Sequence, residues 1–364
     1  MKNIPQIRFP EFSGEWEEKR LGEIGNIKYG KGQNEIKNKI GNFPIIGTSG
    51  ILGTSGEYLY DKESVILGRK GTIDKPIYIN KPFWCVDTTF FFEFYKAYVP
   101  KFIFYLLNKI NWKIYNESTG VPSLSLNTIK KIKIHIPEPK EQQKIASFLS
   151  AVDEKIELTT KRIEKLKEYK KGLLQKLLNV KNGVPKLRFP EFSGEWIERR
   201  LGEVATIKKG IQLNKLNMIE NGQYPVINGG IEASGYTNDF NTNENTITIS
   251  EGGNSCGYVN FIKTKFWCGG HCYKLESIKV NKKYLYFILK KEETKIMRLR
   301  VGSGLPNIQK NDLVKYKLYF PPTLAEQQKI ASFLSGIDEK IELNEQVLDK
   351  MKEYKRGLLQ KMFV

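Results

Sequence analysis

The stretch EQQKIASFLSAVDEKIEL at residues 141–158 returns almost letter for letter as EQQKIASFLSGIDEKIEL at residues 326–343. Farther along each copy, KEYKKGLLQK at 167–176 returns as KEYKRGLLQK at 352–361. The apolar residues of both copies are spaced alternately by four and three positions, which is the heptad pattern of a helix with one narrow apolar seam. The chain is therefore predicted to contain two versions of one long helix, and these helices decide its fold.

Matching apolar positions define the seam of each predicted helix. The seam consists of Ile145, Leu149, Val152, Ile156, Ile163 and Leu166 in the first helix and of Ile330, Leu334, Ile337, Ile341, Leu348 and Met351 in the second. Polar residues occupy the seam at Thr159 and Lys170, and again at Asn344 and Lys355. Each helix could pack on its own domain alone, but a narrow stripe over about five heptads favours a helix pair. We expect an antiparallel coiled coil with pseudo-twofold symmetry.

A second stretch, RFPEFSGEW, occurs at residues 8–16 and without change at residues 188–196. Its proline and glycine exclude a regular helix, and its three aromatic residues are expected to pack as a hydrophobic plug where each domain begins. Between this opening and the helical ending, the two copies differ from each other. The repeated stretches thus mark a common scaffold, and we expect the divergent segments to act on different targets.

Short strands dominate the divergent segments. SVILGRKGTI, KPIYIN, FWCVDTTFFFEF and IKKIKIHIP alternate apolar and polar residues or form short apolar runs, whereas VPKFIFYLLNKINWKIYN has the helical period. The predicted fold class is α+β, with two β-rich domains in tandem, each followed by a long α-helix. The predicted order is a first domain at 1–139, a first spacer helix at 140–179, a linker at 180–186, a second domain at 187–322 and a second spacer helix at 323–364.

The chain has 364 residues and a formal net charge of +19 at pH 7, which attracts polyanions. Most of this charge belongs to the two long segments, because residues 1–140 carry a net +7 and residues 179–325 a net +9. We therefore expect both domains to face the polyanion. No apolar run is long enough to span a bilayer and the first residues show no secretory signal, so we expect a cytoplasmic protein without membrane contact.

Motifs for metal, nucleotide and catalytic sites are weak. Glycine-rich stretches such as GGNSCG lack the lysine and hydroxyl residue of a phosphate-binding loop. Cys268 and Cys272, near His271, have a loose spacing for zinc, and buried strand cysteines are the favoured interpretation. The two halves share no set of catalytic residues, although a duplication would repeat an active site. We expect no catalysis, metal or cofactor in this chain.

Both halves do share a polar, glycine-containing loop after a strand, GRKGT at 68–72 and SEGGNS at 250–255. Such loops can donate hydrogen bonds to phosphates and base edges, although any one residue fits a solvated turn about as well. DNA contacts are predicted at Lys31, Arg69, Lys70, Thr72, Ser118, Thr119, Ser123, Lys209, Asn228, Glu251, Asn254, Ser255, Ser303 and Asn307. Glu251, the acidic member, could accept a hydrogen bond from a cytosine amino group.

Taken together, the duplicated opening RFPEFSGEW…RLGE and the duplicated ending EQQKIASFLS…DEKIEL…GLLQK resemble the specificity subunit of type I restriction-modification systems. The resemblance covers the whole chain. It implies that each divergent segment is a target recognition domain that reads one half of a bipartite, asymmetric site in double-stranded DNA. It also implies that the helices fix the gap between the half-sites.

The same resemblance implies the partners and cofactors of the complex. Two modification (methyltransferase) subunits would dock on the helices, and restriction subunits with motor and nuclease activity would join them. S-adenosylmethionine, ATP and Mg²⁺ would act in those partners, and this chain would hold none of them. The sequence also allows two other hypotheses, a coiled-coil scaffold whose basic domains hold RNA or acidic proteins, and a self-sufficient enzyme whose cofactor site the sequence does not reveal.

Overall fold

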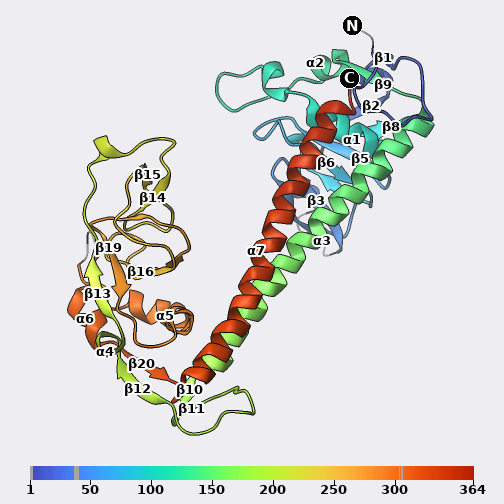
Figure 1. The fold of residues 1–364 in the computed structure, drawn as a ribbon. Coiled ribbons are helices and arrows are strands. Elements are labelled where there is room, and N and C mark those ends of the chain that lie inside the picture. The colour runs from blue at the N-terminus through green and yellow to red at the C-terminus, as the bar shows by residue number, and fades with distance from the viewer. Residues whose placement is uncertain (1–2, 37–40, 303, 305) are drawn as a thin grey trace. The chain divides into compact units, whose positions relative to one another are not determined.

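The computed structural model describes residues 3–36, 41–302, 304 and 306–364. It divides into two compact units, Met1–Thr160 with Gln346–Val364 (unit 1) and Lys161–Glu345 (unit 2). Each unit contains one domain together with a part of each long helix, α3 (Pro139–Leu178) and α7 (Leu324–Lys361) (Figure 1). The compact units thus cut across both helices, whereas the predicted domain boundaries follow the helix ends.

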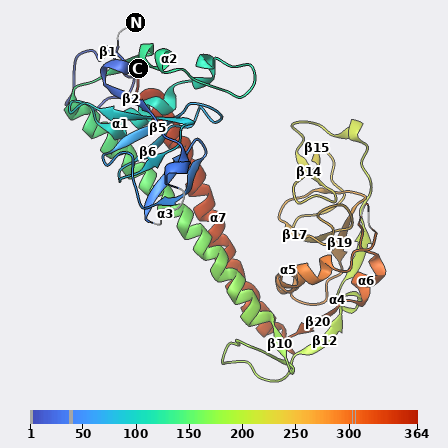
Figure 2. The ribbon, with the colours of Figure 1, turned by 180° about the vertical axis from the view of Figure 1, so that it is seen from behind.

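The first domain is built from two small sheets and a strand pair. One sheet has the order β2 (Gly25–Tyr29), β8 (Thr89–Phe94), β5 (Ser64–Gly68) and β6 (Ile77–Ile79), all antiparallel. The other has the order β4 (Gly50–Ser55), β3 (Phe43–Gly47) and β7 (Trp84–Cys85), and β1 (Glu17–Arg20) pairs with β9 (Lys133–Ile136). Helix α1 (Pro100–Lys109) packs beside β5 and β6 (Figure 2). The remaining elements are η1 (Leu21–Glu23), η2 (Gln33–Glu35), η3 (Trp112–Tyr115) and α2 (Leu126–Lys131).

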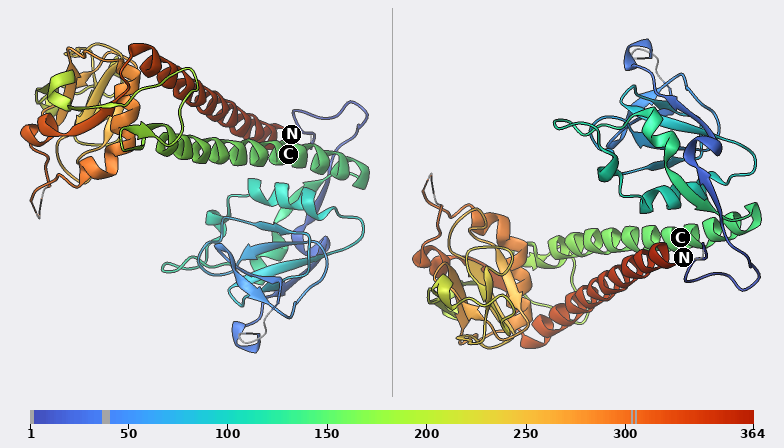
Figure 3. Two further views of the ribbon diagram at one scale, coloured as in Figure 1. Left: turned by 90° about the horizontal axis from the view of Figure 1, so that it is seen from below. Right: turned by 90° about the horizontal axis from the view of Figure 1, so that it is seen from above.

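The second domain repeats this plan. Its four-stranded sheet has the order β13 (Thr206–Lys209), β19 (Cys272–Glu276), β16 (Thr246–Ser250) and β17 (Val259–Ile262). Its three-stranded sheet is β15 (Gly235–Thr237), β14 (Tyr224–Ile227) and β18 (Trp267–Cys268), and β12 (Ile197–Arg200) pairs with β20 (Lys317–Phe320). Helix α5 (Lys282–Met297), orange in Figure 3, packs against β17. The smaller elements are α4 (Leu201–Val204), η4 (Lys215–Asn217) and α6 (Lys310–Lys315).

The predicted α+β class with tandem domains and long helices is confirmed, and one local prediction needs correction. Part of IKKIKIHIP is helical rather than extended, because Ser125 Oγ accepts a hydrogen bond from the Thr128 amide at 3.2 Å and caps α2, which ends at Lys131. The linker forms a hairpin of β10 (Val180–Lys181) and β11 (Val184–Pro185). Its turn is the Asn-Gly pair at 182 and 183, where both residues have positive φ.

A clamp joins the repeated opening of unit 1 to its helix. The Arg8 guanidinium donates two hydrogen bonds to the Glu141 carboxylate, from Nε at 2.8 Å and from Nη2 at 2.7 Å. Trp16 Nε1 donates to the same carboxylate at 3.4 Å, and its ring lies edge-on to Phe102 in the core. The Glu141 side chain is 0% exposed, so the carboxylate depends on these donors. The opening stretch therefore anchors the domain to the first turn of α3.

Unit 2 repeats the clamp with the same chemistry. Arg188 donates to Glu326 from Nε and Nη2, each at 2.8 Å, and Trp196 Nε1 donates at 3.3 Å. The neighbouring residues Gln142 and Gln327 are also buried, and each accepts a hydrogen bond from the amide at the N-cap of α1 or α5, at 2.9 and 3.0 Å. Buried polar partners of this kind explain why the first letters of EQQKIASFLS are identical in both copies.

Ion pairs between the helices show how the helices pair within each unit. In unit 1, Lys355 Nζ lies 2.6 Å from Asp153 Oδ1. In unit 2, Lys167 contacts Glu345 at 2.7 Å, and Lys170, one turn farther along α3, contacts Asp338. As the residue number increases along α3, the number of the contacting residue in α7 decreases, so the two helices are antiparallel. All twelve predicted seam residues are buried or half-buried.

Among the helices in the described ranges, none combines the length and the apolar character needed to cross a membrane.

Candidate nucleic-acid interface

In the first domain, one backbone frame holds three loops together where β5 ends. The Arg69 amide donates to Thr88 O at 2.8 Å, and Arg69 O accepts from the Leu124 amide at 2.9 Å. Gly71, whose φ is +95°, donates from its amide to Pro122 O at 2.8 Å. The loop after β5 is thereby fixed between the loop before β8 and the loop at 117–124. Sequence-distant side chains are presented together at this edge.

The second domain has the same frame with different residues. The Glu251 amide donates to His271 O at 2.9 Å, and Glu251 O accepts from the Ile308 amide at 2.8 Å. Gly253, with φ of +79°, donates to Pro306 O at 3.0 Å. These hydrogen bonds match those of the first domain one by one, so Glu251 corresponds to Arg69 and His271 to Thr88.

The structure brings most of the predicted contact residues to this frame. Lys70 and Ser123 form a bridge in the first domain, and Gly252 and Asn307 form its counterpart in the second. Exposed or half-exposed positions are Lys31, Arg69, Lys70, Thr72, Ser118, Thr119, Ser123, Lys209, Asn228, Glu251, Asn254, Ser255 and Asn307. Ser303 lies outside the described residues.

Several predicted residues also have local structural roles. Asn228 Oδ1 accepts a hydrogen bond from the His271 amide at 2.8 Å, and Ser118 O and Oγ accept bonds within their own loop. A residue that stabilises its loop with one atom can still use its other polar atoms to contact a ligand. Assignment of DNA contacts to these individual residues stays a prediction.

Side chains at the matched positions differ in charge between the domains. In the first, the Arg69 guanidinium lies 5.2 Å from the centre of the Tyr29 ring and donates from Nη1 to Asp87 O at 3.1 Å. Because aromatic faces attract cations, this contact holds the guanidinium in place and leaves further N–H donors for a ligand. The first domain therefore presents an oriented cation at this position.

The second domain has an ion pair at the corresponding place. Lys209, which aligns with Tyr29, has its Nζ 2.6 Å from Glu251 Oε1. The single proton of the Tyr273 hydroxyl lies between the same oxygen, at 3.0 Å, and Ile308 O, at 3.1 Å. Burial, together with this carboxylate, raises the Tyr273 pKa. Glu251 Oε2 is buried without a hydrogen bond and lies 3.7 Å from His271 Nδ1. In the second domain, the charge of Glu251 is therefore neutralised by Lys209, and Tyr273 and His271 complete the cluster.

Glycines open a hollow of about 430 Å³ beside this cluster. It is lined by Gly229, Gly230, Gly252, Gly253, Asn254, Ser255, His271, Pro306 and Asn307. The first domain has Lys70 where Gly252 lies, and Thr48 Oγ1 is within 3.5 Å of a Cβ built at Gly71. Tyr29, Thr88 and His271 also belong to this surface although they were not among the predicted contact residues, because they become neighbours of the predicted loops only through strand pairing.

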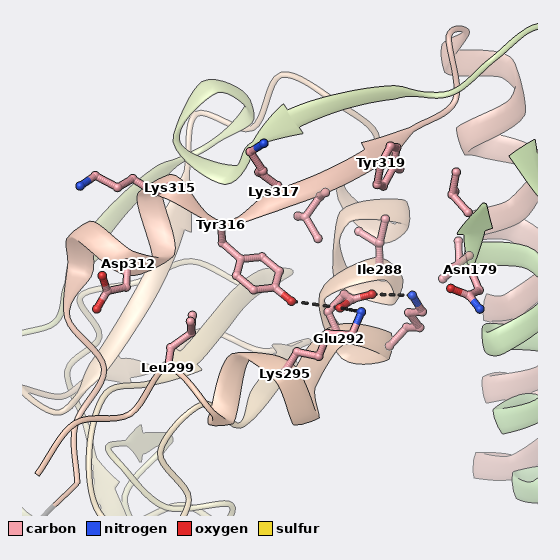
Figure 4. Close-up of a pocket in the computed structure, with 14 residues that line it drawn as sticks. Asn179, Ile288, Glu292, Lys295, Leu299, Asp312, Lys315, Tyr316, Lys317 and Tyr319 are labelled. Atoms are coloured by element: carbon pink, nitrogen blue, oxygen red, sulfur yellow. Dashed lines mark hydrogen bonds and ion pairs between the residues drawn. The ribbon is translucent and has the colours of Figure 1, made fainter. Parts of the chain in front are cut away.

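Another hollow, of about 420 Å³, lies between α5, α6 and β20 (Figure 4). The buried Glu292 carboxylate is its centre, and it accepts from the Tyr316 hydroxyl at 3.0 Å and pairs with Lys291 and Lys295. Burial raises the Glu292 pKa, but the lysines and the hydroxyl outweigh burial and lower the pKa below its usual value. Because donors already surround the carboxylate, this network has a structural role.

The four cysteines are free and buried. Burial raises the pKa of the Cys85 thiol to about 12, and a hydrogen bond with Cys268, with burial added, raises the Cys272 pKa well above its usual value. Thiols of this kind are poor ligands and nucleophiles. Within the described residues, no group of three or more His, Cys, Asp or Glu side chains is placed to hold a metal ion.

The chain thus contains two tandem α+β domains, each clamped to a long helix and each with the same backbone frame at one edge. The family model described as "Type I restriction modification DNA specificity domain" matches residues 13–168 and again residues 193–353. The chain belongs to this family and carries two of its domains.

Relatives and solved structures agree with this assignment. A putative type I specificity subunit of Mycoplasma pneumoniae is 34% identical over 182 residues, which are 49% of this chain and 48% of that protein. The MjaVIII specificity subunit of Methanocaldococcus jannaschii is 25% identical over 98% of this chain and 93% of its own length. The chain thus matches about half the length of the first relative. The crystal structure of the type I S subunit from M. genitalium has the same fold, with a TM-score of 0.77, 20% identity and 99% coverage of both chains.

Proposed function

We propose that this chain is the sequence-specificity subunit of a type I restriction-modification complex, and that it has no catalytic activity of its own. Each domain reads one half of a bipartite, asymmetric site in duplex DNA, and the paired helices set the gap and dock two modification subunits. The observation that carries this proposal is one backbone frame, filled with unlike side chains, at the corresponding edge of two tandem specificity domains. The comparisons lend no support to an RNA-binding or acidic-protein-binding scaffold.

Partners supply the chemistry in this proposal. Adenine methylation with S-adenosylmethionine belongs to the modification subunits, and ATP- and Mg²⁺-dependent motor and nuclease activity to the restriction subunits. The complex acts in the cytoplasm, where it meets the DNA that it modifies. The net charge of +19 supports binding to a phosphate backbone, since lysines and arginines that displace counterions supply much of the affinity for DNA.

Sequencing of methylated adenines tests the proposal. In cells that carry this chain with its modification subunit, we expect one bipartite motif whose two halves differ, because Arg69 and Glu251 differ at the same frame position. Cells with the modification subunit alone are the control and should lack the motif. Methylation without any bipartite motif, or a motif that does not require this chain, would contradict the proposal.

Salt dependence gives a second prediction, based on the matched positions Lys70 and Gly252. Lys70→Ala should make the slope of log K against log salt shallower by about 0.9, because one phosphate contact is lost. Gly252→Lys should make it steeper by about the same amount, and a Cβ at this glycine meets its nearest atom at an ordinary 3.6 Å. Binding of specific DNA by the complex, titrated over a range of salt, measures both slopes. Equal slopes for the wild-type complex and both variants would show that neither position 70 nor position 252 contacts a phosphate.

A further inference from the structure

The second domain contains a buried carboxylate oxygen whose role the fold alone does not explain. Glu251 Oε1 receives two donors, Lys209 Nζ at 2.6 Å and the Tyr273 hydroxyl at 3.0 Å, whereas Oε2 has none. A buried acceptor without a donor costs free energy, so a nearby donor would stabilise the domain. His271 Nδ1, at 3.7 Å from Oε2, is near enough to become that donor after a small rotation of its ring.

His271 is placed for contact with a ligand. Its side chain is 64% exposed and lines the hollow of about 430 Å³ together with the polar residues Asn254, Ser255 and Asn307. Its backbone is fixed at both ends, since its amide donates to Asn228 Oδ1 and its carbonyl accepts from the Glu251 amide. An exposed ring on a fixed backbone, beside a hollow walled by glycines, can approach a nucleic-acid surface closely.

Glu251 is less suited to direct contact than its charge suggests. Oε1 already has two donors, and Oε2 lies beneath the protein surface beside His271. A base could reach Oε2 only if the histidine ring moved aside. Direct contact between this carboxylate and a base is therefore disfavoured.

We propose that His271 contacts a base in the second half-site and that Glu251 is the positioning residue that selects its tautomer. A hydrogen bond from Nδ1–H to Glu251 Oε2 leaves Nε2 without a proton, and Nε2 then accepts a hydrogen bond. In the major groove the donors that match it are the exocyclic amino groups of adenine and cytosine. This inference rests on the proposed function and names one contact within it.

The corresponding position of the first domain has different chemistry. Thr88 takes the place of His271, and Arg69, held on Tyr29, takes the place of Glu251. A guanidinium can donate two hydrogen bonds to guanine O6 and N7. One frame thus presents a donor in the first half-site and an acceptor in the second.

Selection of bound sequences from a DNA pool with randomised half-sites tests the proposal, with the chain in complex with its modification subunit. His271→Ala should reduce discrimination at one position of the second half-site by about 5-fold or more. The first half-site serves as an internal control and should keep its sequence. Thr88→Ala, at the matched position of the first domain, should leave the second half-site unchanged.

Glu251→Gln separates positioning from a merely structural role. Because Lys209 and Tyr273 both donate to one oxygen, the amide oxygen of glutamine takes that place and its NH₂ group faces His271. Nδ1 must then accept, so Nε2 carries the proton and becomes a donor. The preferred base at that position should change from adenine or cytosine to one with a carbonyl acceptor, guanine or thymine.

The outcomes are distinct. A second half-site that stays equally strict with His271→Ala, or a Glu251→Gln variant that loses affinity for all sequences equally, overturns this inference and leaves the proposed function intact. A wild-type complex that selects no bipartite sequence overturns both. His271 is exposed, so its alanine variant is expected to fold even if the glutamine variant does not.

Discussion

Arg8→Met is expected to lower the free energy of unfolding of unit 1 by about 3–5 kcal/mol. The Glu141 carboxylate is 0% exposed and Arg8 is its only charged partner among the described residues, so the variant leaves a buried charge with only the long hydrogen bond from Trp16. Hydrogen exchange measured by mass spectrometry, with denaturant added, resolves the loss to peptides of α1 and the start of α3. Arg188→Met should produce the same loss in unit 2, around Glu326.

A double replacement provides the control for this prediction. Arg8→Met combined with Glu141→Leu removes both charges and should recover much of the loss, because apolar groups of similar volume can replace a buried ion pair at little cost. A loss below about 1 kcal/mol in Arg8→Met alone would show that the clamp is a surface contact of the ordinary weak kind.

A seven-residue insertion in both helices is expected to abolish recognition of the original site and to create a site with a longer gap. One heptad adds about 10 Å of helix, which corresponds to about 3 base pairs of duplex, and preserves the spacing of the seam. The insertions belong after Thr159 in α3 and after Leu348 in α7, which face each other in the register set by Lys355 with Asp153. Methylome sequencing should show unchanged half-sites separated by about 3 more base pairs.

Insertion in α3 alone is the matched control. With seven extra residues in α3 alone, the helices cannot form the Lys355–Asp153 pair and the Lys170–Asp338 pair at the same time. DNA methylation by the complex should therefore decrease, and no site with a new, defined gap should appear. Changed half-site bases in the doubly inserted chain would contradict the proposed division of labour between domains and helices.

Repetition made the scaffold predictable from sequence. Identical stretches identify the helices, and the four-three spacing gives the seam, because these features depend on local periodicity. The clamp was not predicted, since an arginine in RFPEFSGEW and a glutamate at the start of a helix both fit exposed positions. Only the tertiary structure shows that Glu141 is buried and that Arg8 reaches it.

The sequence predicted which loops form the contact surface, but it did not predict which other residues lie beside them. Arg69 and Glu251 could be picked from loops after strands, but their partners Tyr29 and His271 come from strands or turns far along the chain. The stretches FWCVDT at 83–88 and FWCGGH at 266–271 already align Thr88 with His271, but only the hydrogen bonds of the frame show that both residues lie beside the predicted loops. Sequence periodicity carries no such information, because strand pairing decides which side chains become neighbours.

The two clamps also bear on how new specificities arise. Arg8 with Glu141 and Arg188 with Glu326 form the same contacts with nearly the same distances. If recombination between the repeated stretches exchanged one domain for another, the new domain would therefore form the same clamp with the helix. If each domain reads its own half-site as proposed, such an exchange is expected to change the target sequence without any compensating mutation in the clamp.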